Sequence, residues 1–329
     1  MRAALLYGPG DLRVGEAPRP RPGEGWALVE PRAVGVCGTD KAFYRGTYPL
    51  LERPLIPGHE VSGVVVDGPE ELVGESVVSE INFACLRCRV CRAGLYTHCP
   101  NRRTLGIDYP GGMAELMAAP AWALHRHRLP HEVAFTAEPL AAVLNALHQE
   151  PPREGWSVAV LGTGFIALLA AQALRLRGFD PVVVARPGSR KAGRLRGMGF
   201  RVLGFEEALE AGRAESWSGL GFDMVFEATG SNRGLRQAVA LARPRGVVHA
   251  KSTPGGEAPL PLTEAVVKEV RVVGTRCGTF REFQAALRLL EAGAVRVPVD
   301  ASYPLEEARQ AFERSLEGDT FRVVVRPTG

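Results

Sequence analysis

The stretch that decides the fold of this chain is Val158-Ala159-Val160-Leu161-Gly162-Thr163-Gly164-Phe165-Ile166-Ala167. Its leading apolar residues are typical of a buried strand, and they run into a G-x-G-x-x-A turn followed by a helix-like segment. The first glycine of such a turn allows a tight bend, and the second lets a pyrophosphate approach the backbone. The start of the following helix offers free N–H groups and a positive dipole end to phosphates. The residues expected around a dinucleotide are Gly162, Thr163, Gly164, Phe165 and Ile166.

Strands and helices alternate after this motif, which predicts an α/β domain with a doubly wound, Rossmann-type parallel sheet. An isolated G-x-G-x-x-A is weak evidence, because an ordinary structural turn can have the same letters, so this context is what supports a dinucleotide site. The expected strands are residues 182–185, 201–203, 224–226, 247–250 and 270–274, and the expected helices are residues 165–177, 190–197 and 234–241.

The first 140 residues or so have a different character. Short Val-rich runs separated by Gly and Pro, such as residues 27–30, 61–66 and 75–79, predict many short strands joined by turns. After residue 274 the sequence predicts helices over 280–292 and 305–316 and a last strand over 322–325. A chain of 329 residues is too long for one ordinary domain and comfortable for two.

The composition is that of a soluble globular protein, with 46% hydrophobic and 23% charged residues. With 40 basic and 36 acidic residues the formal net charge is +4, so charge gives no reason to expect a nucleic acid or a membrane as partner. The sequence shows neither a secretory signal nor an apolar run of the ~18 residues that a membrane span needs. We therefore expect a cytoplasmic protein whose six cysteines stay reduced and serve metal binding or catalysis.

Four cysteines, Cys85, Cys88, Cys91 and Cys99, have the spacing C-x2-C-x2-C-x7-C. Four thiolates in one short loop suit a closed tetrahedral zinc site, which stabilises a lobe that has no core of its own. An iron–sulfur cluster is the alternative, because ferredoxins also contain C-x2-C-x2-C and a proline after the fourth cysteine, as Pro100 is here. In ferredoxins three residues separate the third cysteine from the fourth, whereas seven separate Cys91 from Cys99 here. Structural zinc is therefore the favoured prediction.

A second, sparser pattern of metal-ligand types lies nearer the N-terminus. Cys37 and His59 offer a thiolate and an imidazole, and a catalytic zinc needs two or three protein ligands and one open position. The hydroxyl of Thr39 is suited to carry a proton from an alcohol, while Asp40 and Glu60 are suited to orient the ligands. On spacing alone, a buried cysteine in a turn and a hydrogen-bonded histidine explain the pattern equally well.

Together these segments resemble the zinc-containing medium-chain dehydrogenase/reductase family, which includes alcohol, sorbitol, threonine and glucose dehydrogenases. The segments are Val34-Gly35-Val36-Cys37-Gly38-Thr39-Asp40, Pro57-Gly58-His59-Glu60-Val61-Ser62-Gly63 and the cysteine quartet, and the match runs in order through nearly the whole chain. The resemblance implies a β-rich GroES-like catalytic domain split around an inserted Rossmann domain. It implies catalytic-domain segments at residues 1–143 and 278–329, a structural zinc lobe at about 82–102, and a dinucleotide-binding domain at 144–277.

The same resemblance implies two zinc ions per chain, one structural and one catalytic, with Cys37 and His59 as ligands of the catalytic ion. The family's third ligand is a Cys, Asp or Glu just ahead of the cofactor domain, and Glu138-Pro139-Leu140-Ala141 is similar to its Glu-Pro-Leu form. Glu138 is therefore expected to bind the zinc or to hold its water. Glu60 competes with it for the third position.

The end of the second predicted strand distinguishes NADP from NAD. An NAD enzyme usually has an acidic residue there, which accepts from the ribose 2′-hydroxyl. This chain has Ala185 and Arg186, a small residue and a cation that suits a 2′-phosphate, so NADP is the predicted cofactor and NAD the alternative. One more surface arginine in an Arg-rich chain is the plainer explanation of Arg186. Further contacts are expected from Ser189, Arg190 and Lys191 and, by resemblance, from Thr229, Gly230, Gly274, Thr275 and Arg276.

These patterns predict a zinc-dependent oxidoreductase that transfers a hydride from an alcohol, polyol, sugar or amino-alcohol to NADP. The residues given catalytic roles are Cys37, Thr39, His59, Glu60 and Glu138. Many relatives have a proton-relaying histidine where this chain has Ala42, so either Thr39 passes the proton to the cofactor ribose and water or another group does. By resemblance we also expect a small-molecule alcohol or carbonyl substrate and a homodimer or homotetramer.

Two alternative functions remain open from the sequence. The first is a zinc-free reductase of the same superfamily that acts on enones or quinones. Such reductases lack the Cys37/His59 pair and the cysteine quartet that this chain has, which argues against this alternative. A dinucleotide-binding regulator without turnover is suggested only by Ala42.

Overall fold

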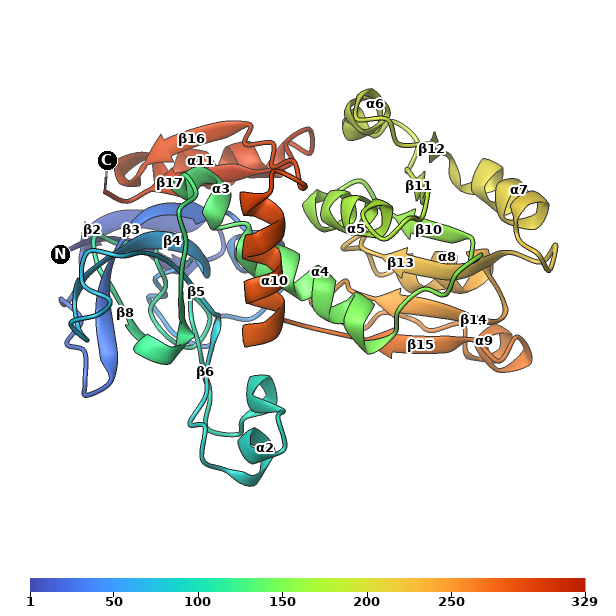
Figure 1. Ribbon diagram of the computed structural model, residues 1–329. Helices are drawn as coiled ribbons and strands as arrows, with labels where there is room; N and C mark the ends of the chain where they lie inside the picture. The colour runs from blue at the N-terminus through green and yellow to red at the C-terminus, as the bar shows by residue number, and fades with distance from the viewer. Residues whose placement is uncertain (329) are drawn as a thin grey trace. The chain divides into compact units, whose positions relative to one another are not determined.

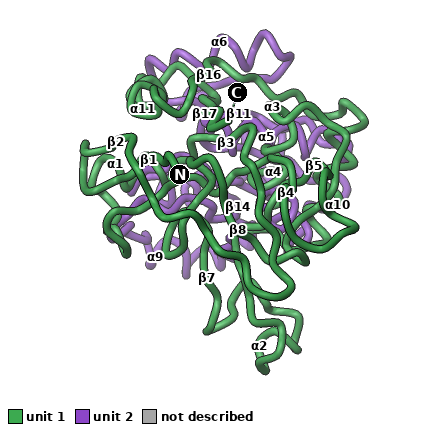
Figure 2. Tube along the Cα trace, turned by 90° about the vertical axis from the view of Figure 1, so that its left-hand side faces the viewer, with its two compact units in different colours: residues 1–141, 277–329 green, residues 142–276 purple. Residues whose placement is uncertain are grey.

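The computed structural model describes residues 1–328 and shows two compact units (Figure 2). Unit 1 comprises residues 1–141 and 277–329, and unit 2 comprises residues 142–276. The units change over at 141/142 and 276/277, whereas the sequence-based domain boundaries are 143/144 and 277/278; those boundaries stay a proposal.

Unit 2 contains a six-stranded parallel sheet with helices packed on it (Figure 1). Its strand order is β12-β11-β10-β13-β14-β15, so the winding reverses between β10 and β13. In such sheets ligands bind beyond the carboxyl ends of the strands at the point of reversal, which is where the Gly162 turn follows β10. The strands are β10 Val158–Leu161, β11 Val182–Val184, β12 Val202–Leu203, β13 Phe222–Glu227, β14 Ala242–Ala250 and β15 Arg271–Gly274.

The first helix of this sheet, α5 (Phe165–Arg175), is buried on nearly every side. Its sequence is almost entirely apolar, and a helix that is hydrophobic all round belongs in a core. Three other helices expose a polar face, and the last of them contacts both β13 and β14: α6 (Arg190–Gly197), α7 (Phe205–Glu215) and α8 (Gly234–Leu241). The remaining helices of the unit are α6 Arg190–Gly197, α7 Phe205–Glu215, α8 Gly234–Leu241 and α9 Leu262–Val267, together with most of α4 Ala137–Gln149.

Unit 1 is built on a mostly antiparallel sheet that uses both ends of the chain. Its order is β16-β17-β3-β4-β5-β9, with β8 also paired to β3. The C-terminal β17 pairs antiparallel with the end of β3, where Val325 is opposite Val34. The sheet strands are β3 Trp26–Gly35, β4 Glu60–Asp67, β5 Ser76–Ser79, β8 Met117–Pro120, β9 Leu124–Arg126, β16 Ala301–Pro304 and β17 Val323–Arg326.

Smaller elements complete unit 1. A hairpin joins β1 (Arg2–Gly8) to β2 (Asp11–Glu16), and β6 (Asn82–Phe83) pairs with β7 (Arg103–Thr104) at the base of the lobe that projects around α2 in Figure 1. The helices are α1 Gly38–Arg45, α2 Arg89–Arg92, α3 His131–Ala134, α10 Phe280–Glu291 and α11 Ala308–Leu316, with short 3₁₀ turns η1 Tyr96–His98, η2 Ala121–Ala123 and η3 Leu305–Glu307. Among residues 1–328, no helix combines the length and the apolarity that crossing a membrane requires.

The predicted parallel sheet and its main helices are confirmed, with shifts of a few residues at some ends. The single helix expected over 305–316 is the 3₁₀ turn η3 followed by α11, and the last strand is 323–326 rather than 322–325. The sequence analysis missed α1 and α4, both of which carry predicted site residues.

Candidate functional site

Cys37 lies at the amino end of α1, just after β3. The fully buried carboxylate of Asp40, on the first turn of that helix, accepts the Cys37 N–H (2.9 Å) and the Gly58 N–H (3.3 Å). One side chain therefore ties the segment that carries Cys37 to the segment that carries His59. Burial raises the pKa of the Asp40 carboxyl.

The structure brings three predicted ligands together. One donor atom each from Cys37, His59 and Glu60 lies within 4.8 Å of the others. His59 is 3% exposed, and its Nδ1 has no hydrogen-bond partner among residues 1–328. That nitrogen lies 3.7 Å from Oδ1 of Asp40, which suits a carboxylate that orients a metal-binding imidazole. A thiol, an imidazole and a carboxylate this close together fit a bound cation by donor type.

The buried groups around Cys37 and His59 also shift the pKa values of these two residues. Burial, and after it the charge of Glu60, raises the pKa of the Cys37 thiol. Burial alone lowers the pKa of His59, but the neighbouring Cys37 and Asp40 outweigh it and raise that pKa well above its ordinary value. A divalent ion bound among these groups would reverse both shifts, because it holds a coordinating thiol as thiolate and an imidazole in its neutral form. These residues therefore fit a zinc ion by donor type, burial and proximity.

Arg322, which the sequence analysis missed, pairs with Glu60. Its Nη2 lies 2.5 Å from Glu60 Oε2, and its Nη1 donates to the carbonyl oxygen of Val36 at 2.9 Å. Both charged side chains are almost completely buried. No sequence motif links position 322 to position 60; the pairing of β17 with β3 brings them together.

Glu138 lies in the first turn of α4 and is 6% exposed. Its charge acts to raise the pKa of His59, so it faces the same group, but it is not part of the compact three-residue set. Thr39 lies partly buried on α1, next to Asp40. Lys41, also missed, is a further neighbour: burial and the charge of Arg322 lower its pKa, while Cys37 raises it.

The cysteine quartet forms a second group. Its four sulfurs lie within 4.8 Å of one another, with Sγ–Sγ distances of 3.5 Å for Cys88–Cys91, 3.5 Å for Cys85–Cys99 and 3.9 Å for Cys88–Cys99. A single tetrahedral ion with metal–sulfur bonds of about 2.3 Å requires sulfurs about 3.8 Å apart. N–H donation from Arg87 and Cys88 lowers the pKa of Cys85 to about 6, whereas burial, and after it hydrogen bonding to Cys88, raises the pKa of Cys91 to about 12. The match to a zinc site therefore rests on the distances between the sulfurs. The quartet therefore fits one zinc ion.

A hydrogen-bonded chain connects this lobe to the rest of unit 1. The Tyr96 hydroxyl donates to Glu80 Oε2 at 2.8 Å and accepts from the Phe280 N–H at 2.5 Å. The other oxygen of Glu80 lies 3.0 Å from Nε2 of the buried His125, which stacks on Phe283. Tyr96 is thus a direct link between the lobe and the first residue of α10.

The predicted dinucleotide residues of unit 2 lie at the carboxyl ends of the strands. Gly162, at φ +123°, follows β10, and Gly164 precedes α5. The hydroxyls of Thr163 and Ser189 are 2.9 Å apart, so the glycine-rich turn contacts the loop after β11. Ala185 is buried on that loop, whereas Arg186 and Arg190 are exposed.

Two further groups, Glu227 and Lys251, escaped the sequence analysis. Glu227 ends β13 and accepts from both the backbone and the hydroxyl of Thr229. Lys251 follows β14, and its Nζ donates to the backbone oxygens of Thr275 (3.3 Å) and Arg276 (2.5 Å), just after Gly274 ends β15. No sequence motif marks either residue. Lys251 meets partners that follow a different strand, β15.

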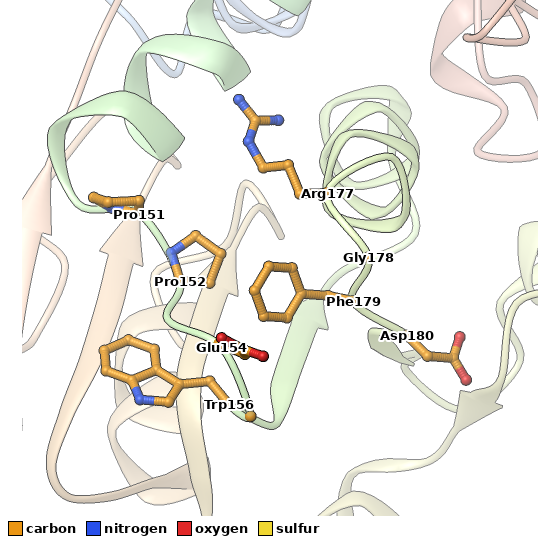
Figure 3. A pocket seen from close by; sticks show the side chains of 9 residues that line it. Pro151, Pro152, Glu154, Trp156, Arg177, Gly178, Phe179 and Asp180 are labelled. Carbon is orange, nitrogen blue, oxygen red and sulfur yellow. The ribbon is translucent and has the colours of Figure 1, made fainter.

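Unit 2 also has an open hollow of about 530 Å³ (Figure 3). It is lined by Pro151, Pro152, Glu154, Gly155, Trp156, Arg177, Gly178, Phe179 and Asp180. These residues precede β10 and β11, so the hollow lies at the amino ends of those strands, opposite the Gly162 turn.

Comparison with known proteins decides the family. Residues 23–130 match the model of the alcohol dehydrogenase GroES-like domain, and residues 166–292 match that of the zinc-binding dehydrogenase domain. The chain is also 30% identical over 338 residues to sorbitol dehydrogenase of Halalkalibacterium halodurans, which covers 98% of this chain and 97% of the relative. This chain belongs to the zinc-containing medium-chain dehydrogenase family. The predicted family and fold class, a Rossmann sheet combined with a β-rich GroES-like domain, are confirmed.

Other members of this dehydrogenase family match at similar levels. L-threonine 3-dehydrogenase of Pyrococcus horikoshii is 28% identical over 321 residues, covering 93% of this chain and 92% of the relative. A solved zinc-binding dehydrogenase of Sinorhizobium meliloti 1021, bound to NADP, superposes with a TM-score of 0.87 at 27% identity and covers 99% of both chains. The named relatives oxidise different molecules, so the family places this chain among oxidoreductases without naming its substrate.

Proposed function

We propose that this chain is a zinc-dependent alcohol dehydrogenase that transfers a hydride from a polyol, sugar, amino-alcohol or simpler alcohol to NADP. The observation that carries the proposal is the compact group of Cys37, His59 and Glu60, whose donor atoms all lie within 4.8 Å of one another. A zinc ion held there supplies a Lewis acid that lowers the pKa of an alcohol oxygen. The dehydrogenase relatives support this chemistry at the level of the family.

In this proposal Cys37 and His59 hold the ion together with one of two carboxylates. Proximity favours Glu60, whose donor atom belongs to the compact group. The ion pair with Arg322 competes for Glu60 and favours Glu138, the ligand expected from the sequence, as ligand or as holder of a water molecule. Asp40 keeps the two ligand-bearing segments in register through its two backbone hydrogen bonds.

Proton removal is assigned to Thr39, since its hydroxyl lies on the helix turn that Cys37 begins. Ala42 supplies no titratable group, so the proton continues from Thr39 to the cofactor ribose and water. Lys41, whose pKa is lowered by burial and by the charge of Arg322, is a candidate for a second acceptor.

NADP is proposed as the cofactor because the loop after β11 offers two exposed cations, Arg186 and Arg190, and no acidic residue at Ala185. The NADP-bound relative supports this choice by similarity. The second zinc is proposed for the cysteine quartet.

A second copy of the chain is the proposed partner, in a cytoplasmic homodimer or homotetramer. The edge strand β15 exposes Val272, and the preceding helix α9 exposes Val266 and Val267, so this side of unit 2 offers an apolar surface and free strand backbone.

The experiment that tests the proposed function is a substrate panel with NADP that covers aldoses, polyols, threonine and simple alcohols. We expect absorbance growth at 340 nm with at least one alcohol class, and loss of that activity in Cys37→Ser with retained NADP binding. A protein that binds the dinucleotide but turns over no substrate in the panel would favour the alternative function, a regulator without catalytic activity. Unchanged activity in Cys37→Ser would rule out a catalytic zinc ion held by Cys37.

A further inference from the structure

Glu227 is a buried carboxylate at the last position of β13, and the proposed chemistry does not use it. Its side chain accepts hydrogen bonds from two residues. Oε1 accepts from the Thr229 N–H (2.8 Å), the Thr229 hydroxyl (2.6 Å) and the Ser252 hydroxyl (2.8 Å), and Oε2 accepts from the Ser252 N–H (3.3 Å). Burying a carboxylate is costly unless hydrogen bonds replace its water, and here donors from two loops do so.

These hydrogen bonds use up both hydroxyl protons. The Thr229 hydroxyl donates to Glu227 and accepts from the Ser231 N–H at 3.0 Å. The Ser252 hydroxyl donates to Glu227 and accepts from the Gly230 N–H at 2.7 Å. A hydroxyl has only one proton to donate, so neither can donate to a ligand without breaking this arrangement. The N–H groups of Thr229 and Gly230 donate within the same arrangement, to Glu227 and to the Ser252 hydroxyl. These two residues can therefore offer a cofactor only acceptors, whose positions Glu227 fixes.

The turn held by Glu227 lies directly against the glycine-rich motif. A Cβ on Gly162 would lie 2.6 Å from the carbonyl oxygen of Ala228, which leaves room only for glycine. On the other side, a Cβ on Gly234, the first residue of α8, would overlap both Glu227 Oε1 and Thr229 Oγ1. Because the two segments are in close contact, a shift of the turn after β13 displaces the Gly162 turn, where the pyrophosphate is expected to bind.

We propose that Glu227 is a positioning residue for the pyrophosphate and nicotinamide riboside of the bound dinucleotide. It acts through the hydroxyls of Thr229 and Ser252 and through the contact between Ala228 and Gly162, without touching the ligand. This inference rests on the proposed function, because it requires a dinucleotide at the carboxyl ends of β10 and β13. The adenosine and its 2′-phosphate bind on the loop after β11, which Glu227 does not contact.

The test compares two ligands in the full-length protein. NADPH has every part of the cofactor, whereas adenosine 2′,5′-bisphosphate lacks the pyrophosphate bridge and the nicotinamide riboside. The variants are Glu227→Gln and the double variant Thr229→Val/Ser252→Ala, with Glu210→Gln on the exposed side of α7 as matched control. Both oxygens of Glu227 face donors, so the amide nitrogen that Glu227→Gln introduces must also face a donor, whichever way the amide is turned.

We expect Glu227→Gln to raise the Kd of NADPH about tenfold, as the loss of one buried hydrogen-bonding arrangement would. The Kd of adenosine 2′,5′-bisphosphate is expected to stay within about threefold, and kcat to fall more than the KM of the alcohol changes, because the hydride acceptor is misaligned. Gly234→Ala, which crowds the same carboxylate, is expected to reproduce the pattern, and Glu210→Gln to change neither ligand.

Equal weakening of both ligands, or no weakening of either, would overturn the inference. If Glu227→Gln does not fold, as judged by circular dichroism, the double variant carries the same comparison. If the wild-type protein binds neither NADPH nor NADH, the proposed function is wrong, and the inference about Glu227 falls with it. If the wild type prefers NADH, then NADH replaces NADPH and AMP replaces adenosine 2′,5′-bisphosphate. The expected changes in the two Kd values stay the same.

Discussion

Arg322 and Glu60 form an ion pair inside unit 1, with Nη2 of the arginine 2.5 Å from Oε2 of the glutamate. The same guanidinium donates to the carbonyl oxygen of Val36, the residue before Cys37. The C-terminal segment thus supplies a cation to a ligand group that the first sixty residues build. Glu60 is therefore held by Arg322 as well as facing Cys37 and His59.

Removing this cation is expected to destabilise the protein. Arg322→Met leaves the Glu60 carboxylate buried without its partner, which costs about 3–5 kcal/mol of unfolding free energy. Urea unfolding measures the loss, with Arg326→Met on the exposed end of β17 as control. In a Glu60→Gln background the cost is expected to shrink by more than half, since no buried charge is then stranded. An equal cost in both backgrounds would show that the ion pair is not what Arg322 contributes.

Stability is expected to depend on pH through His127. Its Nε2 lies 2.9 Å from the Ser62 hydroxyl, which lies 2.7 Å from Nδ1 of His131. Burial, and after it the charge of His131, lowers the pKa of His127 to about 4. A histidine with a lowered folded-state pKa contributes stability that is complete above its unfolded pKa, near 6.5, and that is lost as pH falls towards 4. The loss amounts to at most about 3 kcal/mol.

The substitution His127→Gln keeps a donor for Ser62 but cannot titrate. We expect it to flatten the fall in unfolding free energy between pH 6.5 and 4, measured by urea unfolding at several pH values. The control is His148→Gln on α4. A wild-type slope in His127→Gln would assign the acid sensitivity to other groups.

Tyr96 is expected to stabilise the cysteine lobe. Tyr96→Phe leaves Glu80 Oε2 and the Phe280 N–H each without this partner, at a cost of about 1–3 kcal/mol. We expect a lower Tm and faster release of the lobe's zinc to a chromogenic chelator. Tyr48→Phe, at an exposed tyrosine, should change neither quantity. Zinc release at the wild-type rate from Tyr96→Phe would contradict a role for this link in holding the lobe.

The choice between NADP and NAD is expected to depend on Arg186. Arg186→Ala removes a charged partner of the 2′-phosphate, so kcat/KM for NADP should fall about ten- to hundredfold while the value for NAD stays nearly constant. Arg213→Ala, at an exposed arginine of α7, controls for the loss of one surface charge. Parallel losses with both cofactors would mean that Arg186 does not read the phosphate.

Local patterns allowed the sequence to predict part of the structure. The Gly162 motif and the alternating strands around it predicted the parallel sheet, because a buried strand, a tight turn and a helix each have local signals. The cysteine quartet was predictable because all four ligands lie within one short loop. Several helices were missed, among them α7 and α9. The two missed helices that carry predicted site residues have weak signals: α1 begins at a cysteine, an unusual cap, and α4 contains Pro139 in its first turn, where proline is tolerated but suggests a loop.

The rest of the site depends on contacts between distant segments. Arg322 reaches Glu60 only through the pairing of β17 with β3, and Glu227 meets Ser252 only because β13 and β14 are neighbours. No spacing rule in a single sequence reports such pairs. Whether Glu60 or Glu138 is the third zinc ligand also depends on contacts between distant segments, since both are buried acids near His59.

The most direct test of the central claim, that Cys37 and His59 share a metal ion, is the zinc content of purified protein measured by inductively coupled plasma mass spectrometry. The wild type is expected to contain two zinc ions per chain, and His59→Ala is expected to contain one while keeping the wild-type circular dichroism spectrum. Two ions per chain in both proteins, or one ion in the wild type that His59→Ala retains, would contradict the claim.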